Sequence, residues 1–468
     1  MKLNQSLSLF ALLFVLTSQL GFAQESVSMS LEESIQFALE NNVDAKNAQL
    51  EVLASRGIVG ERRSEGLPQI SSVLEFTANI QPPLIILPAE AGGFFGGNGN
   101  GNGNGNGGAP PPSDVPSDIT VLEFAVPYQS SLNTTVEQMI FNGSYFIGLK
   151  AARTLKDLTE FDKEKAELDV IEQIKKAYFT VLVNEERRGL IEGNQRRLEQ
   201  LLKETEAMRE AGFAEKLDVS RIRVQLNNVK TEIDRVNSSI MVSKELLKMN
   251  MGLPLEVDIF LSQRLNEFAG DELAFTDLIS RDADPRVEVY QMEKNLELAT
   301  LDLKNNQVQY IPTLNAFGTY QRVTGADELR NVYVHDRWFS TSFVGFRLNI
   351  PIFDGLRKSY AIQQNRVQIK QLENAMFATK QNIRFEEIQA KEDLRNSLRA
   401  LEVQNENRQL AEEVFEMTRI KYQEGVGSNF EVVEADADLK EAETNYYSAL
   451  YDALIAKVDL EKALGILK

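Results

Sequence analysis

The chain has 468 residues, a formal net charge of −19, one histidine and no cysteine. Without cysteine it has no disulfides, and with His335 alone a histidine–cysteine metal site or a nucleophile–histidine pair is disfavoured. The acidic balance argues against nucleic acid as a partner, because that binding needs clustered basic surface. We therefore expect no catalytic residue, no cofactor and no metal site.

The first 23 residues have the pattern of an export signal. Lys2 is followed by an apolar run and then by Gly21-Phe22-Ala23, a small-residue cleavage site. The apolar run is too short for a spanning helix, and no later stretch supplies the roughly 20 apolar residues that a membrane helix needs. If the protein crosses a membrane, it must therefore do so with strands.

Five of the six predicted helices follow from apolar residues that recur at helical spacing, and the sixth, within 271–310, follows from the duplication described below. The first begins at Ser30, an N-cap whose partner in a capping box is Glu33, and continues unbroken through residue 63. The others cover about 145–211, 214–251, 357–424 and 429–467. A helix of some 66 residues is about 100 Å long, a length typical of coiled-coil packing.

Four strands are predicted between the helices, in two pairs. In SSVLEFTANIQ, for example, Leu74, Phe76 and Ile80 share one face while polar residues share the other. This alternation is typical of a transmembrane β-barrel strand and equally of a half-buried soluble strand. A Gly-Asn tract joins the first pair and is expected to be an exposed loop. An aromatic girdle at a membrane interface, or ordinary strand aromatics, would explain Tyr320, Tyr333, Trp338 and Phe339.

The chain is also an internal duplication, with two halves that share one plan. The segment REAGFAEKLDV from Arg209 aligns with YQEGVGSNFEV from Tyr422, and the offset is kept where Gly252 meets Gly465. Each half reads helix, strand pair, very long helix, break and helix. The expected segments are the signal peptide (1–23), a first-half helix (24–66), a first strand pair with its loop (67–143), a first coiled-coil hairpin (144–270), a second-half helix (271–310), a second strand pair (311–355) and a second hairpin (356–468).

One chain has too few strands to close a barrel and too few helices to cover the apolar stripes of its long helices. Four strands cannot close a barrel, since about eight are the minimum, and an open sheet edge cannot face lipid. Helices of such length leave apolar stripes exposed unless neighbours cover them. Several copies must therefore pool their strands if these are transmembrane.

The chain resembles the TolC-type outer-membrane factor family over essentially its whole length after the signal. The resemblance rests on the duplicated plan, on the two breaks, and on IFNG (140–143) and PIFDG (351–355) at the entry to the long helices. It implies a mixed α and transmembrane β fold, in which a homotrimer forms one twelve-stranded β-barrel continued by a coiled-coil periplasmic tunnel. The expected location is the outer membrane of a Gram-negative bacterium, extending into the periplasm.

The same resemblance implies a function without enzymatic chemistry. The protein is expected to be the passive exit duct of a tripartite efflux or type I secretion system. Its partners would be a periplasmic adaptor protein, an inner-membrane transporter of the RND, ABC or MFS type, and outer-membrane lipid. The alternative is a non-channel periplasmic coiled-coil adaptor or scaffold, which explains the helices and the export signal but not the strand pattern.

The two helix breaks supply the candidate site. Gly212 and Gly425 provide a backbone that tolerates positive φ, so the chain can reverse there. Just beyond, Asp218, Glu431 and Glu434 fall in first helical turns, where a carboxylate is favoured for purely local reasons. Glu431 and Glu434 are three residues apart and therefore share a face.

For these breaks the resemblance implies a gate and an adaptor contact. Glu431 and Glu434 would form the narrowest constriction, and Asp218 and Tyr422 would help to hold the tip closed. Gly427 stands where the best-known member has arginine, so Arg221 and Arg223 either compensate or are solvated surface residues. Adaptor contact or simple turn chemistry would explain the remaining tip residues, which are Gly212, Phe213, Gly425, Val426 and Gly427.

Overall fold

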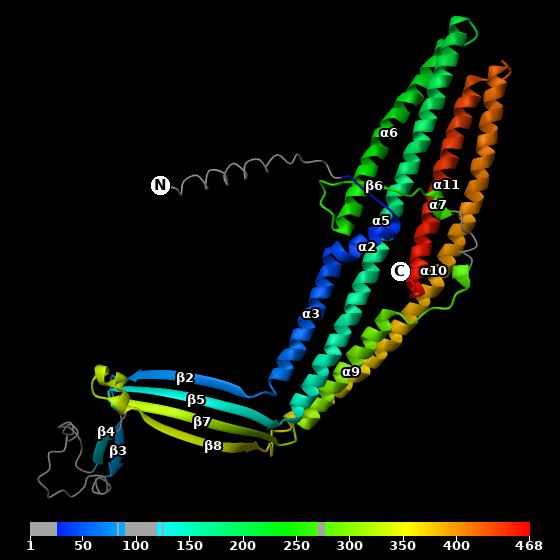
Figure 1. Cartoon of the computed structure of the whole chain (residues 1–468). Helices are drawn as coiled ribbons and strands as arrows, with labels where there is room; N and C mark the ends of the chain where they lie inside the picture. Colours follow the sequence, from blue (N-terminus) through cyan, green and yellow to red (C-terminus); the bar gives the residue numbers. More distant parts are fainter. Residues whose placement is uncertain (1–25, 82–83, 89–118, 124–125, 270–276) are drawn as a thin grey trace, which may run out of the picture. The chain divides into compact units, whose positions relative to one another are not determined.

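The computed structural model describes residues 26–81, 84–88, 119–123, 126–269 and 277–468 (Figure 1). The expected signal peptide and the Gly-Asn tract lie outside these residues. The chain divides into a helical unit, which comprises the described parts of 1–57, 153–300 and 366–468, and a sheet unit, which comprises those of 58–152 and 301–365. The elements in chain order are β1 (Ser26–Met29), α2 (Leu31–Asn41), α3 (Val43–Ser64), β2 (Gln69–Ala78), β3 (Leu84–Pro88), β4 (Ile119–Glu123), β5 (Tyr128–Phe141), α5 (Gly143–Glu210), α6 (Lys216–Met251), β6 (Asp258–Leu261), α7 (Asn266–Ala269), α9 (Val287–Val308), β7 (Thr313–Ala326), η1 (Leu329–Tyr333), η2 (His335–Arg337), β8 (Phe339–Asn349), α10 (Arg357–Gln423) and α11 (Asn429–Ala463).

The single helix predicted from Ser30 is wrong, because the structure divides it into α2 and α3. Ser30 and Glu33 form the capping box at the start of α2 as expected. At Asn42, however, ψ is 140°, and its side-chain Oδ1 accepts hydrogen bonds from the backbone N–H of Asp44 and Ala45 over 2.7 and 3.2 Å. Asn42 therefore caps a new helix, whereas the apolar periodicity continues across it.

The helical unit contains two long hairpins, α5–α6 and α10–α11, which follow the duplication (Figure 1). Its core lies where α5, α10 and α11 pack together, and several large side chains there are completely buried. Examples are Ile174, Tyr178, Leu394, Leu450 and Leu454. The Tyr178 hydroxyl donates to the Met29 carbonyl over 3.2 Å, which fixes the short strand β1 against α5.

Each hairpin helix ends in the same glycine motif. At the first break the N–H of Phe213 bonds to the carbonyl of Met208 (2.8 Å) and that of Gly212 to Arg209 (3.0 Å). This is a Schellman motif, with Gly212 at φ 84°. The motif recurs at Gly252, Gly425 and Gly465, whose φ values are 74°, 74° and 71°.

Two of these glycines make a matched pair for mutagenesis. Gly212→Ala is expected to cost about 1–2 kcal/mol from left-handed backbone strain alone, since nothing lies within 4 Å of the added Cβ. Gly252→Ala adds a collision, because the Cβ would stand 2.5 Å from the carbonyl oxygen of Asn41. Its total cost is expected to be about 2–5 kcal/mol. Chemical denaturation of both variants measures the difference, and equal losses would contradict it.

The sheet unit is built on an antiparallel sheet of order β2-β5-β7-β8. The central pair β5–β7 joins the two halves of the duplication, and its register runs from Tyr128↔Ala326 to Phe141↔Leu314 with a bulge near Met139. β2 and β8 are the edge strands, so one side of each has no neighbour among the strands described.

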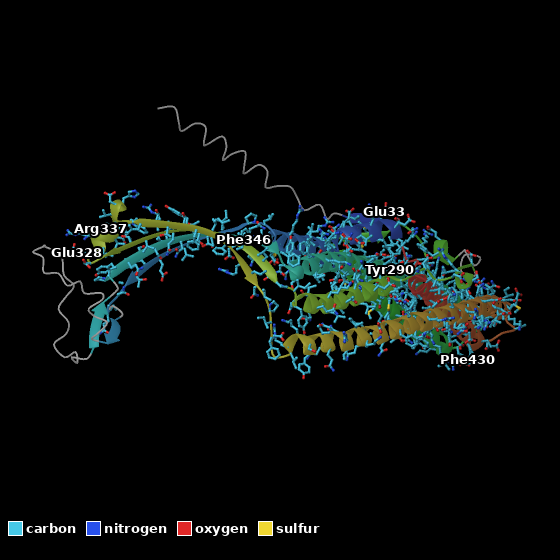
Figure 2. The ribbon with its side chains drawn as sticks, turned by 90° about the horizontal axis from the view of Figure 1, so that it is seen from below. Glu33, Tyr290, Glu328, Arg337, Phe346 and Phe430 are labelled. Atoms are coloured by element: carbon cyan, nitrogen blue, oxygen red, sulfur yellow. The ribbon has the colours of Figure 1, made fainter. Side chains whose placement is uncertain are left out.

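The two faces of this sheet differ in chemistry. The register aligns apolar residues of all four strands on one face, which we call the apolar face, and many of them are exposed. Exposure reaches 87% at Val344 and 76% at Phe346, which Figure 2 shows on β8. The opposite, polar face carries Ser71, Glu75, Thr77, Asn133, Thr135, Glu137, Asn315, Thr319, Gln321, Thr341, Arg347 and Asn349.

Three further features did not follow from the sequence patterns. β1 pairs in parallel with β6, and β3 pairs with β4. The segment from η1 to η2 folds onto the end of the sheet, where Figure 2 shows Glu328 and Arg337. The indole N–H of Trp338 donates to the Val332 carbonyl over 3.1 Å and closes this loop.

Candidate functional site at the hairpin tips

Within the described residues, every helix is either too short or too polar to serve as a membrane span. The turns between the two helices of each hairpin are the exposed ends of these helices. Phe213 is 86% exposed and Val426 is 79% exposed, immediately after the glycines that end α5 and α10. Both turns thus expose an apolar side chain, although the hydrogen bonds that form the turns involve only backbone atoms.

Gly427 is held close to the end of α10. A Cβ at this position would lie 3.1 Å from the backbone nitrogen of Tyr422 and 3.2 Å from the Cβ of Lys421. The N–H of Gly427 also bonds to the Lys421 carbonyl over 3.1 Å. A residue with a side chain, such as the arginine of the family pattern, would therefore have to shift this turn.

The candidate acids are arranged differently in the two hairpins. Asp218 is part of the helix cap, since its Oδ2 accepts the backbone N–H of Glu215 over 3.1 Å. Glu431 and Glu434 are exposed, and with two further acids they form a stripe along α11, which we call the acidic stripe. Its members are Glu431, Glu434, Asp438 and Glu441, spaced by three, four and three residues.

Tyr422 lies inside the protein and is only 7% exposed. Its hydroxyl is 3.2 Å from Thr205 Oγ1, on the other hairpin. Asn429 Nδ2 also donates to Thr205 Oγ1, over 3.3 Å. The structure therefore places Tyr422 in the contact between the hairpins and does not bring it to the acidic stripe.

The two arginines considered for the gate both have partners. The Arg223 guanidinium lies 2.8 Å from Glu206 Oε1, within the first hairpin. The Arg221 guanidinium lies 6.0 Å from the ring centre of Phe430, at the tip of the second hairpin (Figure 2). Arg221 thus links the hairpins through a cation–π contact.

A buried polar network lies further along the same interface. Asp436 is 5% exposed and accepts hydrogen bonds from Asn194 Nδ2 (2.6 Å) and Arg197 Nε (2.9 Å) of α5. Arg197 also lies 5.6 Å from the ring centre of Phe415 and 3.8 Å from the Glu443 carboxylate. We call these five residues the Asp436 network, and it fastens α5 to both helices of the second hairpin.

The comparison with protein families identifies what the second half of the chain resembles. Residues 278–466, nearly the whole second half, match the family model described as outer membrane efflux protein. The second half of the chain is therefore similar to outer membrane efflux proteins. Outer membrane efflux proteins are transport proteins and not enzymes, which agrees with the expectation of a function without enzymatic chemistry.

Solved structures show that the likeness extends over both halves. The chain is similar to CusC, with a TM-score of 0.70 at 16% identity over 94% of this chain and 92% of that one. For the open state of Neisseria gonorrhoeae MtrE the TM-score is 0.68 at 17% identity, over 94% and 89%. For Vibrio cholerae VceC it is 0.66 at 14% identity, over 93% and 96%. No curated protein sequence matches the chain. The expected TolC-like fold is confirmed.

The Asp436 network was not predicted from the sequence. Asp436 sits among exposed acids in the sequence, yet it shares a helical face with Val432 and Leu439, which are buried. An acid at a buried helical position is the signal that could have identified it. Its partners lie 239 and 242 residues away along the chain.

Glu443, at the edge of the network, makes stability depend on pH. Burial raises the pKa of its carboxyl group, and Asp436 and Glu412 act in the same direction, whereas Arg197 and Arg408 oppose them. The folded state therefore binds the proton of Glu443 more tightly than the unfolded state does. The stability that this proton contributes is fully present below the pKa of an ordinary carboxyl group, and it is lost as pH rises through the raised pKa of Glu443 in the folded protein.

Glu443→Gln is therefore expected to gain stability relative to the native chain as pH rises from about 4 to about 8. Melting temperatures across this range measure the gain. A difference between the two proteins that stays constant with pH would contradict the assignment.

Proposed function

We propose that three copies of this outer membrane efflux protein form one exit duct through the outer membrane and periplasm, through which substrates pass without energy from the duct itself. The observation that carries the proposal is the isolated four-stranded sheet, with an exposed apolar face and two edge strands. An exposed apolar patch of this extent marks contact with another protein or a membrane.

Lipid is the environment that fits this face. Alternation of apolar and polar faces over strands of 10–14 residues is the pattern of transmembrane β-barrels. An edge strand cannot remain open in lipid, because each unpaired backbone group costs several kcal/mol. The free edges of β2 and β8 are then expected to pair between copies, and three copies of four strands give twelve.

The helices support assembly independently. In the single chain, α10 exposes a row of large apolar side chains at coiled-coil spacing: Phe377, Phe385, Ile388, Val403, Leu410, Val414, Met417 and Ile420. Neighbouring helices from other copies would cover them. The scaffold hypothesis would also use these helices, but it leaves the apolar face of the sheet without a partner.

We place the gate and the adaptor contact at the hairpin tips. Glu431 and Glu434 would line the constriction, whereas Asp218 and Tyr422 stabilise the closed tips through the contacts described above. The exposed Phe213 and Val426, with the glycines at 212, 425 and 427, would meet a periplasmic adaptor. An inner-membrane transporter would supply the energy.

Disulfide trapping tests the assembly, because the chain has no cysteine of its own. A protein with cysteines at Ser71 or Thr77 of β2 and at Thr341 of β8 is expected to form covalent trimers in outer-membrane fractions. The control pair, Thr135 and Thr341, lies on strands that β7 separates, and it is expected to give none. A water-soluble monomer after export would overturn the proposal and favour the scaffold.

A further inference from the structure

The polar face of the sheet contains a cluster of aromatic side chains, although most other residues on this face are polar. Phe317 and Phe343 lie on this face among Asn, Gln and Thr residues. Arg347 and Glu137 adjoin them. We call these four residues the Phe317 cluster.

The rings are held in defined positions. Phe317 lies over Gly345, its register partner on β8, and a Cβ there would stand 3.0 Å from the ring. Phe343 meets Phe317 edge-on, with ring centres 6.2 Å apart and planes at 79°. Such edge-to-face pairs are stabilised by the charge distribution of the rings. The absence of a side chain at Gly345 therefore gives Phe317 a fixed place on the sheet.

The charged residues complete the cluster but are weakly tied to each other. The Arg347 guanidinium lies 5.1 Å from the ring centre of Phe317, within cation–π range. Its Nη1 is 3.9 Å from Glu137 Oε1, and the two side chains are 64% and 56% exposed. An exposed pair at that distance contributes little, so an incoming anion can replace Glu137 at modest cost.

We propose that the Phe317 cluster is a contact site for aromatic anions on the inner wall of the barrel. An aromatic body would stack on Phe317 and Phe343 while its anionic group pairs with Arg347. The inference rests on the proposed function, which turns the polar face toward the lumen and repeats the cluster three times around it. A site of this kind binds aromatic anions in preference to small anions that lack an aromatic body.

Current block in planar bilayers tests the site. With the purified trimer, 2-naphthalenesulfonate is expected to reduce the current at lower concentration than either methanesulfonate or a naphthyl trimethylammonium ion. Arg347→Met and Phe317→Leu are each expected to weaken block by naphthalenesulfonate about fivefold or more. Glu137→Gln is expected to strengthen it, because the competing carboxylate is removed.

Arg322→Met is the matched control. Arg322 lies 5.8 Å from the ring centre of Trp338, so this variant also removes an arginine–aromatic contact, but its register places it on the apolar face. Block of the Arg322→Met channel by 2-naphthalenesulfonate is expected to equal that of the native protein. Arg347→Lys, which keeps the charge, is expected to retain part of the block and serves if Arg347→Met does not assemble.

The possible results separate the two proposals. Native block in Arg347→Met, with or without a lower melting temperature, would overturn the contact site and leave the cluster a purely structural role. Weakened block in Arg322→Met would overturn it as well. If the native protein is not a trimer that inserts into bilayers, the proposed duct itself fails.

Discussion

Asp436→Ala is expected to destabilise the helical unit by about 2–3 kcal/mol, because it removes a buried carboxylate that accepts a charge-assisted hydrogen bond from Arg197. Arg197, whose side chain is 26% exposed, would lose the carboxylate that its Nε contacts, and Asn194, which is 2% exposed, would lose an acceptor. The affected contact joins α5 to α11, so the same change is expected to separate the hairpins. Chemical denaturation measures the first effect, and protease sensitivity of the tips measures the second.

Three variants make the Asp436 experiment specific. Asp438→Ala, in the exposed acidic stripe, is expected to change stability by less than about 0.5 kcal/mol. Asp436→Asn keeps the size of the side chain and is expected to lose less than alanine. Arg197→Met combined with Asp436→Leu removes both charges and is expected to recover much of the loss. If Asp436→Ala and Asp438→Ala cost the same, the network has no special role.

Alanine at both Glu431 and Glu434 is expected to lower cation selectivity of the assembled duct roughly tenfold. In the proposed trimer, two exposed carboxylates in each of three copies, six in all, would disappear from the proposed constriction. Rings of carboxylates attract cations and repel anions at close range, so block by multivalent cations is also expected to weaken. Reversal potentials and cation block in planar bilayers measure both effects.

The control for the tip acids removes equal charge elsewhere. Glu402 and Glu406 are also exposed, but they lie in α10 well before its tip. Alanine at both is expected to leave selectivity close to that of the native protein. If the two double variants behave alike, the selectivity comes from the overall acidity of the chain, and the constriction assigned to Glu431 and Glu434 is wrong.

The elements that the sequence predicted well are those determined locally. The long helices and strands depend on periodicity within a segment, and the helix ends depend on Gly212 and Gly425, where only the backbone conformation matters. The break at Asn42 was missed because asparagine can occupy either the interior of a helix or an N-cap. Its hydrogen bonds to the backbone N–H of Asp44 and Ala45 make it a cap, and the sequence alone does not show them.

The site was predicted less completely because its contacts join distant parts of the chain. Asp436 looks like any other acid of α11 until α5 is packed against it. Tyr422 was singled out by resemblance, but its partner Thr205 lies 217 residues away. The Phe317 cluster depends on the register of three strands, and register depends on the assembled sheet rather than on any one segment.

The central pair β5–β7 has a consequence for how the chain folds. Its contacts join residues such as Thr135 and Thr319, which are 184 positions apart, so this pairing must wait until the second half is available. Long-range pairing of this kind is slow because a large loop must close first. Of the four-stranded sheet, a fragment ending after α6 would retain only the β2–β5 pair, and an isolated two-stranded pair is marginally stable in water. Despite the duplication, neither half is an autonomous folding unit of the sheet.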